Sequence, residues 1–199
     1  MSSLTEQVLN FVESQPEGTP ISAKGLLHLS NRAAVDQTLS RLAKSGEITR
    51  LERGSYIRPV QTKFGSRAPD SEKLIEQLGA RGETIVTSGG AAANALGLTT
   101  QVPVREVYLT SGRSRHLSLG GKREIELRHA KRWQLLNRHN RAGEAVRALE
   151  WLGPQHVQKA LTTLRSKLHP AEVKEIEAMR PALPGWLAQE ISATVPVYG

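Results

Sequence analysis

The 199-residue sequence contains no cysteine and only two aspartates, Asp36 and Asp70. The absence of cysteine excludes disulfides, thiolate nucleophiles and cysteine zinc sites, and it fits a reducing compartment. Aromatic residues make up only 4% of the chain, and no apolar run reaches the ~18 residues that a membrane-spanning helix needs. Residues 1–7 have neither the basic nor the apolar region of a secretory signal. We therefore expect a cytoplasmic protein without a membrane partner.

Basic side chains are in excess and are unevenly distributed. The 27 Lys and Arg residues against 19 Asp and Glu give a formal charge of +8, which favours a polyanionic or an acidic protein partner. Residues 1–60 have a net charge of +1, residues 61–141 of +7, and residues 142–199 of 0. The excess therefore lies in the middle of the chain.

The most informative pattern lies in residues 32–58. Val35, Leu39 and Leu42 recur at i, i+4 and i+7, which predicts a helix with one apolar face. Gly46 ends this helix, since glycine readily takes a positive φ. Two short strands follow, at residues 48–51 and 56–58, around a turn that contains Gly54. A polar helix face followed by a hairpin with Arg at its tip is typical of a winged helix-turn-helix.

The preceding residues complete this prediction. A helix is expected from Thr5, its N-cap, to Ser14, followed by a turn over residues 16–20 that contains two Pro and a Gly. A second helix is expected over residues 23–29, with a short turn before the third, which Ser30 or Asn31 caps. A small helical domain that binds nothing would give the same pattern. We predict a winged helix-turn-helix DNA-binding domain over residues 1–60.

Candidate DNA contacts follow from the polar side chains of this segment. Arg can pair with guanine, and Asn or Gln with adenine, in the major groove. Other basic side chains suit phosphates, which position a protein without specifying sequence. The candidates for the groove are Asn31, Arg32, Gln37, Ser40 and Arg41, and the candidates for the backbone are Lys44, Arg50, Arg53 and Arg58.

The rest of the chain is expected to form a linker, residues 61–69, and a C-terminal domain, residues 70–199. In this domain we expect a helix from residue 70 and strands at 84–87, 102–110, 116–119 and 124–129, with a small-residue helix at 88–98. Helices follow at 142–151, from Pro154 to 168, at 171–179 and at 184–191. The predicted fold class is α+β, with a winged helix-turn-helix followed by a mixed α/β domain that ends in helices.

The strands of the C-terminal domain carry a second group of basic residues. They suit a face that docks on DNA backbone or on an acidic protein, although an ordinary solvated sheet face would have the same composition. The candidates are Arg105, Arg113, Arg115, Lys122, Arg123, Arg128, Lys131 and Arg132.

Chemistry at a metal or cofactor is not indicated. His116, His129 and His139 lack metal-ligand spacing and have no paired carboxylates beside them, so we predict no metal site and no catalytic residue. Gly89 and Gly90 do not belong to a Gly-x-x-x-x-Gly-Lys phosphate loop, and small residues more often allow close packing. We therefore predict no cofactor, and we expect Trp133, Trp151 and Trp186 to anchor the core.

Two segments resemble the AbiEi-like antitoxins, the transcription-regulating half of bacterial type IV toxin–antitoxin systems. Residues 39–56, LSRLAKSGEITRLERGSY, are similar to the end of that family's winged-helix domain. Residues 89–103, GGAAANALGLTTQVP, with the strand VYLT at 107–110, are similar to the start of its C-terminal domain. The likeness spans roughly residues 1–130.

The resemblance implies a repressor of its own operon, bound to double-stranded operator DNA. It also implies a C-terminal domain that counters a nucleotidyltransferase-like toxin, with which a stable complex is not required. On this basis the chain is expected to be a DNA-binding autorepressor and antitoxin, and not an enzyme. A regulator that senses a small ligand near Ser88–Gly90, and a nucleic-acid-modifying enzyme, are the alternatives.

Overall fold

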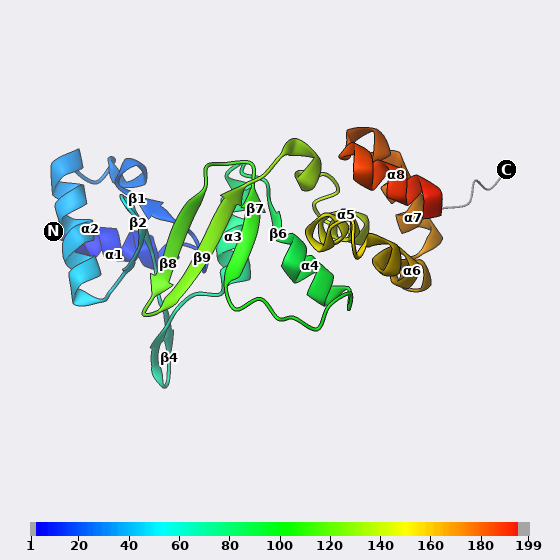
Figure 1. Cartoon of the computed structure of the whole chain (residues 1–199). Helices are drawn as coiled ribbons and strands as arrows, with labels where there is room; N and C mark the ends of the chain where they lie inside the picture. The colour runs from blue at the N-terminus through cyan, green and yellow to red at the C-terminus, as the bar shows by residue number, and fades with distance from the viewer. Residues whose placement is uncertain (1–2, 195–199) are drawn as a thin grey trace. The chain divides into compact units, whose positions relative to one another are not determined.

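The computed structural model describes residues 3–194 and has an α+β fold (Figure 1). The predicted limits Met1 and Gly199 lie outside the described residues. The chain forms two compact units. Unit 1 comprises the residues up to Glu83 together with Arg115–Glu126, and unit 2 comprises Thr84–Ser114 and the residues from Leu127 onward. The fold is thus mixed α+β as predicted, but the second unit is not one continuous stretch of chain.

Unit 1 begins with helical segments and a small antiparallel sheet, in the order expected. The strand order is β1-β3-β2, with Ile21 opposite Tyr56 and Arg50 opposite the same residue on the other side. Apolar residues such as Val8, Leu26 and Leu39 are fully buried between these elements. The elements are α1 (Leu4–Ser14), β1 (Ile21–Ser22), η1 (Ala23–Leu26), α2 (Arg32–Ser45), β2 (Thr49–Glu52) and β3 (Ser55–Ile57).

Local capping explains where these helices begin and end. Ser3, and not Thr5 as predicted, caps α1, because its hydroxyl accepts from the Glu6 amide while the Glu6 carboxylate accepts from the Ser3 amide. Asn31 caps α2 by accepting from the Ala34 amide at 3.0 Å. Gly46 ends α2 with φ +83°, as predicted.

The second predicted helix is much shorter than expected. It is a single 3-10 turn, Ala23–Leu26, and does not reach residue 29. The Ser22 side chain makes no capping bond here, and Gly25 is a weak helix former inside the turn. The run of leucines was therefore a poor guide to helix length.

The predicted linker contains a hairpin. Strands β4 (Val60–Thr62) and β5 (Gly65–Arg67) pair antiparallel, and Gly65 takes φ +110°. Residues 61–67 are all exposed. Because neither face of the hairpin is buried, its sequence lacks the alternation of apolar and polar residues from which strands are predicted. Helix α3 (Ser71–Ala80) follows, close to its expected position.

Two later strands complete unit 1. Strand β8 (Arg115–Gly120) and the part of β9 (Arg123–His129) up to Glu126 belong to it. Strand β2 lies alongside β8, with Thr49 near Gly120 and Glu52 near Arg115. Unit 1 therefore extends beyond residues 1–60, and its boundary differs from the one predicted at residues 61–69.

Unit 2 combines a small sheet with a group of helices. Strands β6 and β7 pair antiparallel, with Ile85 opposite Thr110, and the amide of Ala130, just after β9, donates to the carbonyl of Thr110. Its elements are β6 (Ile85–Thr87), α4 (Gly89–Ala95), β7 (Glu106–Thr110), the end of β9, η2 (Arg132–Leu135), α5 (Arg141–Leu152), α6 (Val157–Lys167), α7 (Pro170–Met179), η3 (Arg180–Ala182) and α8 (Gly185–Thr194).

Strand β7 is shorter than the strand predicted over residues 102–110. Pro103 has no amide hydrogen to donate to a neighbouring strand, and Val102 and Val104 are exposed to solvent. The apolar alternation of residues 102–105 therefore did not indicate a buried strand.

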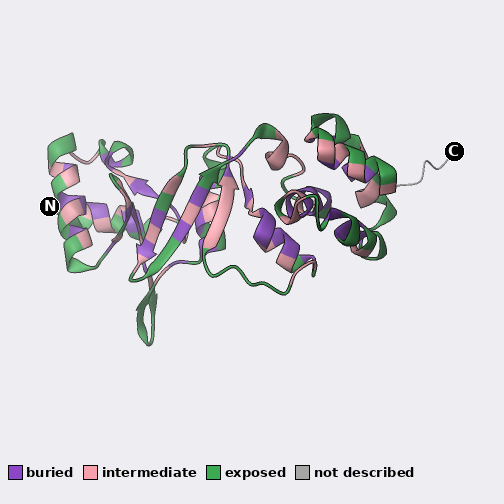
Figure 2. Cartoon of the chain, in the orientation of Figure 1, coloured by how far each residue is buried: buried purple, intermediate pink, exposed green. Residues whose placement is uncertain are grey.

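Close contact between α4 and α5 fixes the centre of unit 2, where both helices carry buried residues (Figure 2). A Cβ atom at Gly89 would lie 2.5 Å from the carbonyl oxygen of Arg147 and 2.6 Å from Cβ of Trp151. Gly89 and Gly90 therefore allow α4 to pack closely against α5. This agrees with the prediction that these small residues serve close packing and do not form a phosphate loop.

Only part of the prediction for the tryptophans is correct. Trp133 and Trp186 are partly buried against the core of unit 2, but Trp151 is 46% exposed. Its ring lies over Gly90 at the edge of the α4–α5 contact.

Within residues 3–194, no helix combines the length and apolar character needed to cross a membrane.

Candidate nucleic-acid interface

Helix α2 turns a polar face away from the core of unit 1. Its buried side chains, Val35, Thr38, Leu39 and Leu42, form one stripe. At 100° per residue, the opposite side of the helix is a separate stripe. This stripe consists of Ala33, Gln37, Ser40, Arg41 and Lys44, which are exposed except for the half-buried Ser40.

Four predicted contact residues, Gln37, Ser40, Arg41 and Lys44, thus share one exposed face, and this face adds one further candidate. Ala33 lies on this face in the first turn of α2. A methyl side chain at such a position allows close approach to a base edge, and it can contact a thymine methyl group. Its exposure on a polar helix face was the available signal.

The first turn of α2 contains an ion pair. Arg32 Nε lies 2.8 Å from Asp36 Oδ2, and the side chains are 64% and 47% exposed. An exposed pair at i and i+4 contributes little to stability. Its main effect is to orient the guanidinium and to place a negative charge beside it.

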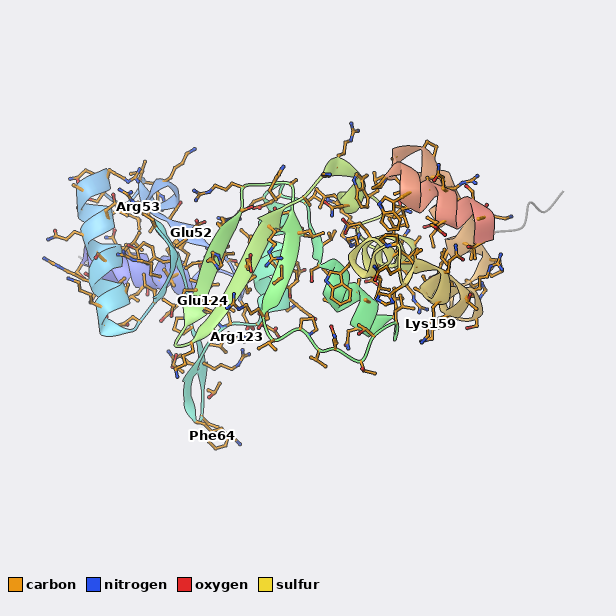
Figure 3. The ribbon with its side chains drawn as sticks, in the orientation of Figure 1. Glu52, Arg53, Phe64, Arg123, Glu124 and Lys159 are labelled. Carbon is orange, nitrogen blue, oxygen red and sulfur yellow. The ribbon has the colours of Figure 1, made fainter. Side chains whose placement is uncertain are left out.

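The β2–β3 turn presents Arg53 to solvent (Figure 3). Arg50, on β2, is also exposed, but its Nη2 donates to the hydroxyl of Tyr56 at 3.3 Å and its guanidinium lies 5.5 Å from the centre of the Tyr56 ring. Arg50 is therefore held against the sheet, whereas Arg53 extends from the turn.

Arg58 does not belong with the α2 face. It is half-buried in a groove that Leu9, Glu13, Gly46 and Glu47 also line. Two carboxylates in this groove make it a poor site for a phosphate. The sequence placed Arg58 next to the hairpin, but the end of β3 directs it into the groove between α1 and the end of α2.

The predicted second basic face divides between the two units. Arg115, Lys122 and Arg123 belong to unit 1, whereas Arg105, Arg113, Arg128, Lys131 and Arg132 belong to unit 2. On β9, Ile125 and Leu127 are buried, and Glu124, Glu126 and Arg128 alternate with them. The outward side of this strand is thus mixed in charge, and its two glutamates weaken it as a basic face.

Arg115 is not a free cation. Its Nη1 and Nη2 donate to Glu83 Oε1 and Oε2, each at 2.7 Å, and its Nε lies 3.5 Å from Glu52 Oε1. The hydrogen bonds to Glu83 raise the pKa of Arg115 above its ordinary value, against the opposing effect of burial. Arg115 therefore joins β8 to Glu52 on β2 and to Glu83, which follows α3. Its role in a docking face stays a prediction.

Arg123 is also engaged. Its Nη2 donates to the hydroxyl of Ser71 at 2.9 Å and its Nη1 to the carbonyl of Pro69 at 3.5 Å. These contacts tie β9 to the start of α3. Arg123 and Arg115 thus both hold segments of unit 1 together, a role that composition alone does not reveal.

A buried arginine in unit 2 was missed by the sequence analysis. Arg147 on α5 is only 2% exposed, and its Nη1 donates to the carbonyls of Gln134 and Leu136. Burial lowers the pKa of Arg147, an effect that the charge of Glu144 opposes. Its neighbours on α5 are alanines and valine, so its position in an apolar helix stripe was the only signal.

An open pocket of about 660 Å³ in unit 2 is lined by residues 97–101 and by Trp151, His156, Lys159 and Thr163, among others. Its lining contains no carboxylate. Over residues 3–194, no three His, Asp or Glu side chains gather as metal ligands would.

Comparison with known families adds one result. A family model described as a family of unknown function, DUF6088, matches residues 7–175. The chain belongs to the DUF6088 family. The match includes most of α1, the polar face of α2, the β4–β5 hairpin and the α4–α5 contact. No curated protein matches this DUF6088 chain.

Proposed function

We propose that the protein is a sequence-specific DNA-binding autorepressor and the antitoxin of a bacterial type IV toxin–antitoxin system. In this proposal it works in the cytoplasm, has no catalytic reaction and acts against a nucleotidyltransferase-like toxin. The exposed stripe of α2, with Gln37, Arg41 and Lys44 opposite the core, is the observation that carries the DNA-binding part.

The arrangement of α1, η1, α2 and the β2–β3 hairpin supports a winged helix-turn-helix. In such domains a polar helix lies in the major groove and a hairpin contacts the adjacent backbone. Helix α2 begins with a capped N-terminus at Asn31, the end that commonly meets base edges. The Arg53 side chain at the turn suits a phosphate.

The antitoxin part is supported by the resemblance of residues 39–56 and 89–110 to AbiEi-like antitoxins. Helices α4 and α5 pack closely at the centre of unit 2, and the second of these segments includes α4. A ligand-sensing role near Ser88–Gly90 is disfavoured, because the backbone of α5 and the Trp151 side chain fill the space beside Gly89.

The test uses full-length protein and the duplex that lies upstream of its own reading frame. We expect this duplex to bind at least tenfold more tightly than a scrambled duplex of equal composition, as measured by fluorescence anisotropy. Arg41→Ala should weaken specific binding by about 1–3 kcal/mol, whereas Arg165→Ala on α6, an exposed arginine of unit 2, should not.

A second measurement addresses the antitoxin. Cells that express the neighbouring nucleotidyltransferase-like reading frame should grow only when the full-length protein is also expressed. Equal binding to the upstream and scrambled duplexes would overturn the role as a repressor. Failure to protect the cells would overturn the role as an antitoxin.

A further inference from the structure

The tip of the β4–β5 hairpin exposes a large aromatic side chain. Phe64 is 90% exposed, and every residue from 61 to 67 is exposed as well (Figure 2). Phe64 is one of only two phenylalanines in the chain, and the other, Phe11, packs against the core of unit 1. Figure 3 shows Phe64 at the far end of the hairpin, away from the rest of unit 1. An aromatic ring in water at such a position gives no stability to the fold.

Hydrogen bonds order this tip. The hydroxyl of Thr62 donates to the carbonyl of Gly65 at 2.7 Å and accepts from the amide of Phe64 at 3.2 Å. Gly65 has φ +110°, a conformation that a residue with a side chain rarely adopts. The turn therefore fixes the backbone at Phe64.

The base of the hairpin is anchored too. Glu17, in the turn after α1, accepts from the amide of Asp70 at 3.0 Å and from Nη1 of Arg67 at 3.4 Å. These bonds join the end of β5 to the turn that precedes β1. The hairpin is thus a fixed arm of unit 1, the unit that also carries α2.

The charge of the arm identifies its partner. The hairpin itself, residues 60–67, contains Lys63 and Arg67 and no acidic residue. Arg67 is paired with Glu17 at the base, so Lys63 is the cation at the tip. Lys63 Nζ lies 5.1 Å from the centre of the Phe64 ring, so a cation and an aromatic face occupy the tip together. An apolar protein groove would accept the ring but would remove the Lys63 ammonium from water at a cost. Duplex DNA offers stacked bases for the ring and phosphates for the ammonium.

We propose that the β4–β5 hairpin is a second DNA-contacting arm, in which Phe64 wedges into a base step through the minor groove. Lys63 binds a phosphate beside that step. Apolar side chains that enter the minor groove unstack a step in this way, and flexible pyrimidine–purine steps accept them most readily. The inference rests on the proposed binding of DNA by unit 1.

The test uses the full-length protein and the shortest upstream duplex that it binds specifically. 2-Aminopurine is placed at successive positions of this duplex. Binding of the unmodified protein should raise the fluorescence at one step only, since unstacking removes the quenching by neighbouring bases. Phe64→Ala should abolish this rise and weaken binding about tenfold, whereas Phe64→Trp should retain both.

Controls separate the wedge from folding and from the other DNA contacts. Phe64→Ala should leave the melting temperature unchanged, because the ring touches no core residue. Val104→Ala, which shortens a fully exposed side chain of unit 2, should change neither fluorescence nor affinity. Lys63→Ala should reduce the slope of log K against log salt by about 0.9.

The outcomes distinguish this inference from the proposed function. If the unmodified protein binds no DNA specifically, the proposed function and the Phe64 wedge are both overturned. If it binds specifically but Phe64→Ala has unchanged affinity and no step brightens, only the wedge is overturned. If Phe64→Ala retains DNA binding and loses protection from the toxin, the tip contacts a protein, and the wedge is again overturned.

Discussion

The guanidinium of Arg115 holds both carboxylate oxygens of Glu83 through two parallel hydrogen bonds of 2.7 Å. The side chains are only 11% and 18% exposed. A bidentate pair in this environment is a strong and directional contact. It links strand β8 to a residue 32 positions earlier in the chain.

Arg115→Ala should therefore destabilise unit 1 and should not act as the loss of a DNA contact. Removal of one partner leaves the Glu83 charge half-buried, and we expect a loss of about 3 kcal/mol in the free energy of unfolding. Urea denaturation measures it, with Lys122→Ala, at the exposed β8–β9 turn, as the control. If the Arg115→Ala protein is fully folded and still binds DNA much more weakly, this structural role is contradicted.

Gly89→Ala should destabilise unit 2. The added Cβ would lie 2.5 Å from a backbone oxygen of α5, and backbone cannot move aside as a flexible side chain can. Overpacking of this kind costs about 1–3 kcal/mol, which thermal denaturation would detect. Gly185→Ala on α8, where nothing lies within 4 Å of the new Cβ, is the matched substitution, and we expect no loss from it. Equal melting temperatures for the two variants would refute the α4–α5 contact as the reason for Gly89.

Arg53→Ala should weaken specific and non-specific DNA binding to the same degree. Arg53 lies at the exposed β2–β3 turn, where a contact to phosphate carries no sequence information. The slope of log K against log salt should fall by about 0.9, the value for one phosphate contact. Titrations at several salt concentrations measure the slope, and Arg165→Ala serves as the comparison. A loss confined to the specific duplex would mean that Arg53 reads a base.

Asp36→Asn should strengthen non-specific binding and reduce the preference for the operator. The substitution removes a negative charge from the side of α2 and releases Arg32, which Asp36 orients at 2.8 Å. We expect non-specific affinity to rise about threefold at low salt, since one repulsive charge near phosphates is lost. Competition between operator and scrambled duplexes gives the ratio, with Glu150→Gln on α5 as the control. A higher preference for the operator in Asp36→Asn would contradict an orienting role for this pair.

Local signals explain the parts of the fold that could be predicted. The apolar period of Val35, Leu39 and Leu42 and the Gly46 stop predicted α2 closely, because helix faces and helix ends depend on neighbouring residues. The exposed positions of Gln37 and Arg41 followed from the same period. The strands β8 and β9 were also found, through their alternation and the two glycines between them.

The candidate site was harder to predict where long-range contacts decide the role of a side chain. Arg58 lies in a groove with Glu13 and Glu47, and Arg115 is paired with Glu83. Charge and position along the chain do not reveal a partner that is distant in sequence. The β4–β5 hairpin was missed because a short exposed hairpin lacks the apolar alternation that marks a buried strand.

The sequence by itself determined the apolar and polar faces of α2, the glycine that ends this helix, and the excess of positive charge. These depend on residue type and on spacing within a few turns of chain. Only the tertiary structure decided which arginines remain open to solvent, why Gly89 carries no side chain, and that Phe64 lies at the tip of an anchored arm. Each of these features depends on contacts between segments that are far apart in sequence. A periodic pattern within one segment does not say which distant segment it will contact.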